Sequence, residues 1–480
     1  MLASLATYFI LLLLISRRSR GTGGNDDFFR AARNSPWGMV AFGMIGASVS
    51  GVSLVSVPGW VGATRMTYLQ MCLGFVVGYL AVAFVLLPLY YRLRLTSIYS
   101  YLGQRFGGRA RHTGAFFFLL SKLTGAAARL YLAAVVIAAF LPWTFPGGEV
   151  AIAFLALLLI YLYTRWGGIR TLVRTDALQT GCMLAAIGGV LWAVTDRMGL
   201  DAGGMVRTIR ESPLSQVFEW DWRSPGAFWR QFLSGVFIVI VMTGLDQDMM
   251  QKNLTCRSLR DAQKDMCVYG LAFVPVNLLL LSLGVLLHAF CTREGIVPPA
   301  RGDELLPSLV ASGTLGSAVV IPFSIGIVAA AFSSADSALT SLTTSLCIDL
   351  LHIEERQLPE KEAESQRQRV HLGVCAAFLA CILLFRAANS RSVIDAIYVM
   401  ASYTYGPLLG LYAFGIFTRR TVSARPVPYI AVAAPLVCAL LDALSPALWE
   451  YKFGYELLLL NGALTFCGLW LSSNIRRTSA

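Results

Sequence analysis

The chain has 480 residues, of which 56% are hydrophobic and 14% are charged, and its formal net charge is +12. Soluble domains are nearer half apolar and a quarter charged, so this composition excludes an ordinary soluble protein. The positive charge alone would fit a nucleic-acid-binding protein, but its placement along the chain points to membrane topology instead.

Apolar runs follow one another from end to end, each long enough to cross roughly 30 Å of hydrocarbon as a helix. Strands of a membrane barrel would be about half as long and would alternate in polarity. The pattern therefore predicts an all-α polytopic membrane protein with about 13 transmembrane helices. The predicted spans are 2–16, 37–60, 67–90, 113–140, 148–164, 176–196, 229–248, 265–290, 316–348, 370–387, 393–417, 426–447 and 455–473.

The basic residues are distributed unevenly between the two sides of this arrangement. With the N-terminus outside, the inside segments hold 26 Lys and Arg residues and the outside segments hold 11, while Lys122 and Arg129 fall within a span. This asymmetry follows the positive-inside rule, so the charge excess sets topology and does not indicate nucleic acid. The first span lacks a basic leader and a small-residue cleavage site, which favours a retained helix over a signal peptide. We expect an integral protein of the bacterial cytoplasmic (inner) membrane, with the C-terminus inside.

Spans two to six and seven to eleven form two sets of five with opposite topology, the inverted repeat of many secondary transporters. The first helix of each set is interrupted, at 45–59 by glycines and Pro58 and at 242–251 by Gly244. Breaks at mid-membrane free carbonyls and half-helix ends that bind ions or substrates. The predicted division is an extra helix and cytoplasmic loop (1–36), a first repeat (37–196), an extracellular loop (197–228), a second repeat (229–420) and two extra helices (421–480).

The stretch AAAFSSADSAL (329–339) places polar residues deep in the ninth span. Ala330, Ser333, Ser334 and Ser337 share one helix face by the i, i+3, i+4, i+7 pattern, and Asp336 lies at its edge. Small residues also serve close helix packing, but a carboxylate inside a span needs a partner or a cation. Hydroxyls on this face, with carbonyls from the broken first helix, would make an oxygen cage for a sodium-sized ion.

Four segments in chain order resemble the sodium/solute symporter family, which includes sodium/glucose, proline and sialic acid symporters and has a LeuT-type core. They are NDDFFRAARNSPWGMVAFGMIGASVSG (25–51), WGGIRTLVRTDALQ (166–179), AAAFSSADSALTSLTTSLCIDL (329–350) and YTYGPLLGLYAFGIFTRR (403–420). The resemblance covers nearly the whole chain and implies a secondary transporter that uses sodium as its coupling ion.

The resemblance implies a main sodium site. Its ligands would be the carbonyls of Gly46 and Val49 together with Ala330, Ser333 and Ser334, where Ala330 offers only its carbonyl.

Some family members bind a second sodium, and the matching residues here are Asp176, Ser333, Asp336 and Ser337. Asp336 stands where a hydroxyl is usual. It would either strengthen this second site or pair with a nearby cation and abolish the site, and Lys122 is one candidate for that pairing.

The resemblance also places a substrate pocket beside the first break. Ser50, Ser53 and Gln70 match polar contact positions of sialic acid-type members. Arg129 is an intramembrane cation whose fork suits a carboxylate, although a structural ion pair or snorkelling would also explain it.

On the second broken helix, Met242 and Thr243 stand where sugar-carrying members have aromatic residues, which argues against a stacked hexose. Thr243 is a further candidate contact. Asp246 and Asp248 would either gate the pocket or cap solvated turns, and capping is favoured for Asp248.

We therefore expect a sodium-coupled symporter that imports a small polar organic solute by alternating access, with a sialic acid, a monocarboxylate or a sugar as the candidate classes. Its partners would be the solute, sodium and the lipid bilayer, with no nucleic acid and no obligate protein partner. A proton-coupled carrier of the same fold, with Asp176 or Asp336 titrating, is one alternative. A membrane solute sensor with a separate signalling partner is another. An enzyme is disfavoured, because the sequence offers no nucleophile–base pair and no metal-ligand constellation.

Overall fold

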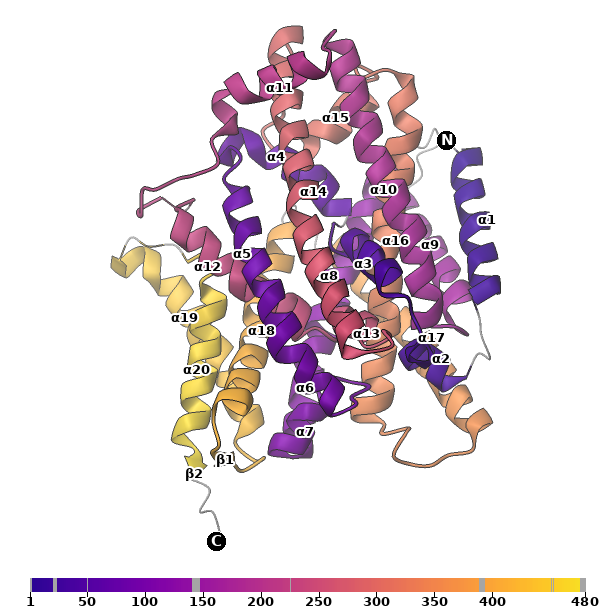
Figure 1. The fold of residues 1–480 in the computed structure, drawn as a ribbon, viewed down its shortest axis with the longest axis vertical. Coiled ribbons are helices and arrows are strands. Elements are labelled where there is room, and N and C mark those ends of the chain that lie inside the picture. Colours follow the sequence, from indigo (N-terminus) through magenta and orange to yellow (C-terminus); the bar gives the residue numbers. More distant parts are fainter. Residues whose placement is uncertain are drawn as a thin grey trace.

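The computed structural model describes residues 2–19, 24–49, 51–139, 147–224, 226–387, 393–449, 451 and 453–474. Helices dominate the described part of the chain (Figure 1). The first half contains α1 (Leu2–Ser19), α2 (Asn25–Arg30), α3 (Trp37–Ser48), α4 (Gly51–Thr64), α5 (Tyr68–Ala81), α6 (Leu87–Arg92), α7 (Ser100–Phe106), α8 (Gly108–Ala139), α9 (Gly148–Thr164) and α10 (Ile169–Arg197).

The second half contains α11 (Ala202–Glu211), α12 (Phe228–Val239), α13 (Gln247–Asn253), α14 (Leu259–Glu294), α15 (Leu305–Ala311), α16 (Val320–Ser345), α17 (Glu360–Ala387), α18 (Val393–Phe417), α19 (Val427–Trp449) and α20 (Leu457–Leu471). Short π-helical turns at Val82–Leu86 and Ile240–Gly244 continue α5 and α12. Strands β1 (Thr421–Val422) and β2 (Ser473–Asn474) form one small antiparallel pair.

Seven of the described helices are long and apolar enough to cross a membrane, and nine spans result when each of two bent pairs counts once. The four remaining predicted spans coincide with α1, α9, α18 and α20, of which α9 and α20 are shorter apolar helices. Every predicted span therefore corresponds to a helix or a bent pair. The total of thirteen crossings stays a prediction.

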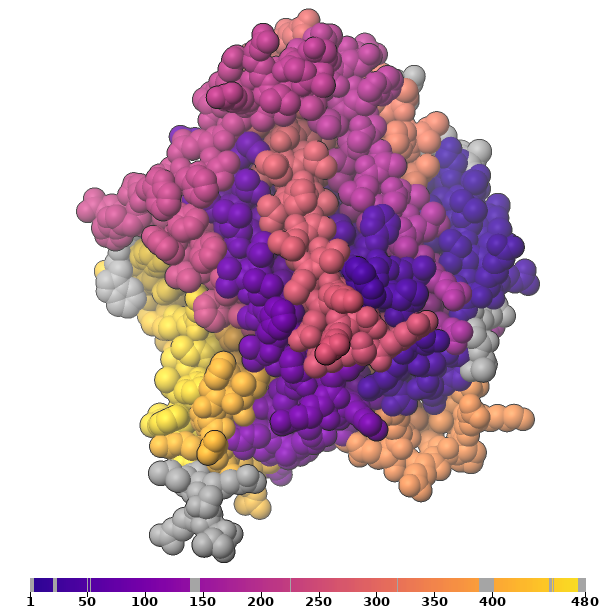
Figure 2. All heavy atoms as spheres, in the orientation of Figure 1, coloured from indigo at the N-terminus to yellow at the C-terminus, as the bar shows by residue number. Residues whose placement is uncertain are grey.

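The long helices stand side by side, with α1 at one edge and α19 and α20 at the opposite edge (Figure 1). Short elements close the two ends: α11 and α15 lie at the upper end, and α2, α7 and the strands lie at the lower end. The segment around α11 covers the upper end in the space-filling view (Figure 2). Helices α3, α10 and α16 pack together in the interior, and α16 is almost entirely buried.

Candidate functional site

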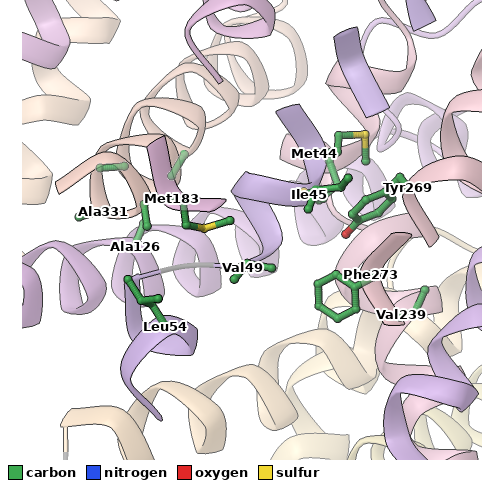
Figure 3. Packing of buried hydrophobic residues seen from close by; sticks show 14 of the residues in the cluster. Met44, Ile45, Val49, Leu54, Ala126, Met183, Val239, Tyr269, Phe273 and Ala331 are labelled. Atoms are coloured by element: carbon green, nitrogen blue, oxygen red, sulfur yellow. The ribbon is translucent and has the colours of Figure 1, made fainter. Parts of the chain in front are cut away.

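The first predicted interruption is a real break. Helix α3 ends at Ser48, and Val49 leaves helical geometry with φ −80° and ψ 77°. The helix pair around the break is bent by 54°. The last carbonyls of a helix have no partner within it, so carbonyl oxygens at 46–49 are available to a ligand. Figure 3 shows Val49 at this break, with Leu54 of α4 on one side and Tyr269 and Phe273 of α14 facing it from the other.

Small residues bring α16 and α10 against this break. A Cβ added to Gly51 would lie 3.4 Å from the Ile327 carbonyl oxygen and 3.8 Å from the Ala330 Cβ. A Cβ added to Gly46 would lie 2.1 Å from the Thr180 hydroxyl oxygen, so only glycine fits there. Glycine is therefore required at Gly46 for the close approach of α3 to α10, whereas Gly51 lies at ordinary van der Waals distance from α16.

The hydroxyl face of α16 is fully buried. Ser333, Ser334 and Ser337 are 0%, 5% and 1% exposed. The Ser333 hydroxyl donates a hydrogen bond to Asp176 Oδ1 at 3.0 Å. The hydroxyl oxygens of Ser334 and Ser337 have no hydrogen-bond partner among the described residues. Buried polar atoms without partners are uncommon, and a bound cation would supply the missing interaction.

Two carboxylates lie next to this face. Asp176 on α10 and Asp336 on α16 are 1% and 0% exposed. Asp336 Oδ2 accepts hydrogen bonds from the Tyr163 hydroxyl and from Gln179 Nε2. Asp336 Oδ1 has no hydrogen-bond partner among the described residues. The Nζ atom of Lys252, near the end of α13, lies 2.7 Å from Asp176 Oδ2.

The second predicted interruption is also a break, and the two halves, Phe228–Gly244 and Gln247–Asn253, are bent by 70°. Asp246 caps α13 by accepting hydrogen bonds from the backbone N–H groups of Asp248 and Met249. Lys122 of α8 lies 3.3 Å from Asp246 Oδ2 and 2.7 Å from Asp248 Oδ2. The Tyr405 hydroxyl of α18 donates to Asp246 Oδ2 at 2.5 Å. Side chains from two other helices thus hold the second break.

A cavity of about 230 Å³ lies between the two breaks. Its wall includes Ser48, Ser53, Thr243, Ser333 and Ser334. Aromatic rings of α5, α14 and α18 cover much of the remainder, and Lys122 and Arg129 of α8 supply two cations. The cavity therefore joins both breaks, the hydroxyl face of α16 and charged groups in one space, as a carrier of a polar solute requires.

The model of the sodium:solute symporter family matches residues 28–424. The chain belongs to this family. It is accordingly an integral membrane protein and a secondary transporter, not an enzyme, and sodium is its coupling ion.

Similar proteins agree with this assignment. The chain is 25% identical over 417 residues to the sodium/sialic acid symporter NanT of Aliivibrio fischeri, covering 82% of this chain and 78% of the relative. It is 24% identical to the sodium/sialic acid symporter SiaT of Proteus mirabilis, covering 91% and 87%. The fold is similar to the substrate-bound outward-open structure of a Na⁺-coupled sialic acid symporter. That likeness has a TM-score of 0.82, 18% identity and 98% coverage of both chains. These matches confirm the expected family and the LeuT-type core.

The structure places most of the sequence-predicted residues of this symporter around the cavity. Ser53, Arg129, Thr243, Ser333 and Ser334 line it. Ala330 lies against Gly51 at the start of α4, just past the break, and Ala47 and Ser48 at the end of α3 line the cavity. Asp176, Asp336 and Ser337 are buried in the adjoining contact between α10 and α16. Ser50 lies outside the described residues.

Gln70 is placed differently from the expectation. Its side chain is fully buried and is not part of the cavity wall. Its Nε2 atom donates to the carbonyls of Thr67 and Gly226, and its Oε1 atom accepts from the backbone N–H of Glu219. These contacts tie the predicted extracellular loop to the start of α5.

Two further expectations are corrected by the contacts. Lys122 was a candidate partner of Asp336, but it pairs with Asp246 and Asp248. Asp248 was expected to cap a solvated turn, but it is 5% exposed and ion-paired. In both cases the pairing depends on the distance between α8 and α13, which sequence spacing does not give.

Lys252 is the functional candidate that sequence reasoning missed. It lies one turn after Asp248, on the short helix that follows the second break. In the sequence, Lys252 is one of several basic residues in the segment QKNLTCRSLR (251–260), which lies between two predicted spans. The sequence feature that could have identified Lys252 is its i, i+4 spacing from Asp248 directly after an interrupted span. A lysine at that place lies close to the membrane interior and needs an acidic partner.

Proposed function

We propose that this symporter imports a small polar organic anion with sodium and that Arg129 binds the carboxylate of the solute. The supporting observation is the difference between the two cations of the cavity wall. Lys122 is already held by two carboxylates. Arg129 has no carboxylate partner among the described residues. A guanidinium group in a part-dry cavity attracts a carboxylate and binds it with paired hydrogen bonds.

The hydroxyl groups elsewhere in the cavity wall suit a hydroxylated solute. Ser48 and Tyr269 share a hydrogen bond, and the Tyr79 hydroxyl donates to Tyr269 at 2.8 Å. These hydroxyls offer both donors and acceptors to a bound molecule. The relatives named above transport sialic acid, a carboxylate with several hydroxyl groups, which fits the same combination.

For the coupling ion we propose the main site predicted from the sequence: the carbonyls of Gly46, Val49 and Ala330 with the hydroxyls of Ser333 and Ser334. The support is the contact between α16 and the first break, together with the Ser334 hydroxyl that lacks a protein partner among the described residues. Sodium at this place would join α16 to the broken helix and so favour the solute-binding arrangement, and by linkage the solute would tighten sodium binding.

We also propose an inner-membrane location with the N-terminus outside and the C-terminus inside, and the two-repeat division of 37–196 and 229–420. The excess of basic residues on the proposed inner side supports the orientation. Helix α1 begins in the upper half of the molecule, whereas β2, the last described element, lies at the lower end (Figure 1). This arrangement fits an odd number of crossings.

The test measures uptake into proteoliposomes under an inward sodium gradient. N-acetylneuraminate serves as the anionic solute, and its methyl ester serves as the uncharged match. We expect sodium-dependent uptake of the acid and much weaker uptake of the ester. Loss of one charge-assisted hydrogen bond, about 1.5–3 kcal/mol, corresponds to about 10–150-fold weaker binding in Arg129→Gln.

Arg109→Gln is the matched control, because Arg109 is an exposed arginine on the same helix. It should leave uptake unchanged. Equal uptake of the acid and the ester, or an Arg129→Gln variant that prefers the acid as strongly as wild type, would overturn the anion assignment.

A further inference from the structure

The second candidate sodium site of this chain contains a cation of the protein itself. Lys252 Nζ lies 2.7 Å from Asp176 Oδ2, and their side chains are only 2% and 1% exposed. The other oxygen of Asp176 accepts the hydrogen bond from Ser333. Both oxygens of the carboxylate that would anchor a second sodium are therefore engaged by protein groups.

Lys252 is surrounded by carboxylates, as a bound sodium ion would be. Asp176 is its direct partner, and Asp248 and Asp336 are the next carboxylates in its electrostatic range. Like charges about 4 Å apart repel strongly where water is scarce. A sodium ion at Asp176 would have to share the carboxylate with the ammonium group, whereas the main site on Ser334 and the first break lies free of that conflict.

The position of Lys252 in the fold makes this contact possible. The Asp246 cap starts α13 after the second break, and α13 packs against α3, α10 and α16. A Cβ added to Gly43 of α3 would be 2.9 Å from the Asp176 Cβ, so α3 closes the other side of the same carboxylate. The Asp246 cap and the packing against α3, α10 and α16 thus fix α13, and Lys252 reaches Asp176 from this fixed helix.

We propose that the ammonium group of Lys252 takes the place of a second sodium ion, so that one sodium accompanies each solute. The inference rests on the proposed sodium-coupled function and deepens it by fixing the coupling ratio. The fixed cation balances Asp176 throughout the binding step, and only the site formed by the first break and α16 exchanges its ion with solution.

The decisive measurement is the number of sodium ions bound and transported per solute. Isothermal titration of purified protein with sodium chloride, against potassium chloride as control, gives the binding count. Parallel uptake of radioactive sodium and of N-acetylneuraminate gives the transport ratio. Wild type should bind and carry one sodium per solute, with a Hill coefficient close to one.

Lys252→Met removes the charge and keeps much of the volume. Asp176 and Asp336 then lack the lysine, so we expect a second sodium to bind and the Hill coefficient to rise toward two. The variant should also be less stable to heat in potassium than in sodium. Lys252→Arg keeps the charge and should keep one sodium, and Lys252→Met with Asp176→Asn should return to one. Lys264→Met, at an exposed lysine of α14, is the matched control.

Two sodium ions per solute in wild type would overturn the inference while leaving sodium coupling intact. A Lys252→Met variant that binds solute and still takes one sodium would overturn it as well. Uptake of the solute that does not depend on sodium would instead overturn the proposed function. If Lys252→Met does not fold, the ratio measured for wild type decides the question alone.

Discussion

Ser333 on α16 donates a hydrogen bond to Asp176 on α10, with 3.0 Å between the hydroxyl and carboxylate oxygens. The same hydroxyl lines the central cavity beside Ser334. Ser333 thus stands between the proposed main sodium site and the buried pair of Asp176 and Lys252. Replacing Ser333 should therefore affect both the sodium site and the ion pair.

Replacement of Ser333 by alanine should weaken sodium binding. It removes one proposed oxygen ligand of the ion, and loss of one charge-assisted contact of about 1.5–3 kcal/mol would lower the apparent sodium affinity about 10–150-fold. Thermal unfolding of purified protein in sodium against potassium measures this. Ser341→Ala is the control, because the Ser341 hydroxyl on the same helix bonds the Ala338 carbonyl of its own helix. An equal sodium response in both variants would contradict the proposed site.

Replacement of Gly46 by alanine should destabilise the protein, because the new methyl group would lie 2.1 Å from the Thr180 hydroxyl oxygen and 3.0 Å from the Thr180 Cα. Forcing extra volume into a packed interior costs about 1–3 kcal/mol. Gly38→Ala is the control on the same helix, because nothing lies within 4 Å of an added Cβ there. The melting temperature should fall for Gly46→Ala and stay level or rise for Gly38→Ala. Equal melting temperatures would show that α3 is not held this closely to α10.

Replacement of Lys122 by methionine should leave Asp246 and Asp248 without their cation. Removing one partner of a buried ion pair costs about 3–5 kcal/mol. The Lys122 side chain is 12% exposed, so the lower end of that range applies. The Asp248→Asn change should restore part of the lost stability in the Lys122→Met background, as a double-mutant cycle of unfolding free energies would show. Strictly additive effects would mean that the two side chains do not interact.

The membrane fold was predictable because its main determinant is local. A stretch of apolar residues about 20 long specifies a membrane helix by itself, whatever its neighbours are. The breaks were also predictable, because glycines weaken a helix and Asp246 caps the next one at their own positions, although Pro58 lies inside α4 and not at the first break. The face of Ser333, Ser334 and Ser337 followed from helical periodicity alone.

The charge pairs were not predictable in the same way. Lys122, Lys252 and four buried aspartates are spread over α8, α10, α13 and α16, and many pairings satisfy neutrality. The pairing is decided by interhelical distances, such as the close approach that Gly43 allows beside Asp176. The expectation for Lys122 was wrong because it considered a cation and an acid without the packing that separates them. The contacts of Gln70 were equally unpredictable from the sequence, because two of its backbone partners, Glu219 and Gly226, lie in a loop far away in the chain.

The proposed role of Lys252 as a fixed substitute for a second sodium ion has an energetic consequence for the cell. A positive charge that belongs to the side chain never crosses the membrane as cargo. Uptake of a monoanion with a single sodium ion then moves no net charge, and the membrane potential neither drives nor opposes it. The highest ratio of inside to outside solute then equals the ratio of outside to inside sodium. A carrier with two sodium ions would reach the square of that sodium ratio and would also be driven by the membrane potential. On the one-sodium proposal, this lysine sets how far the solute can be concentrated.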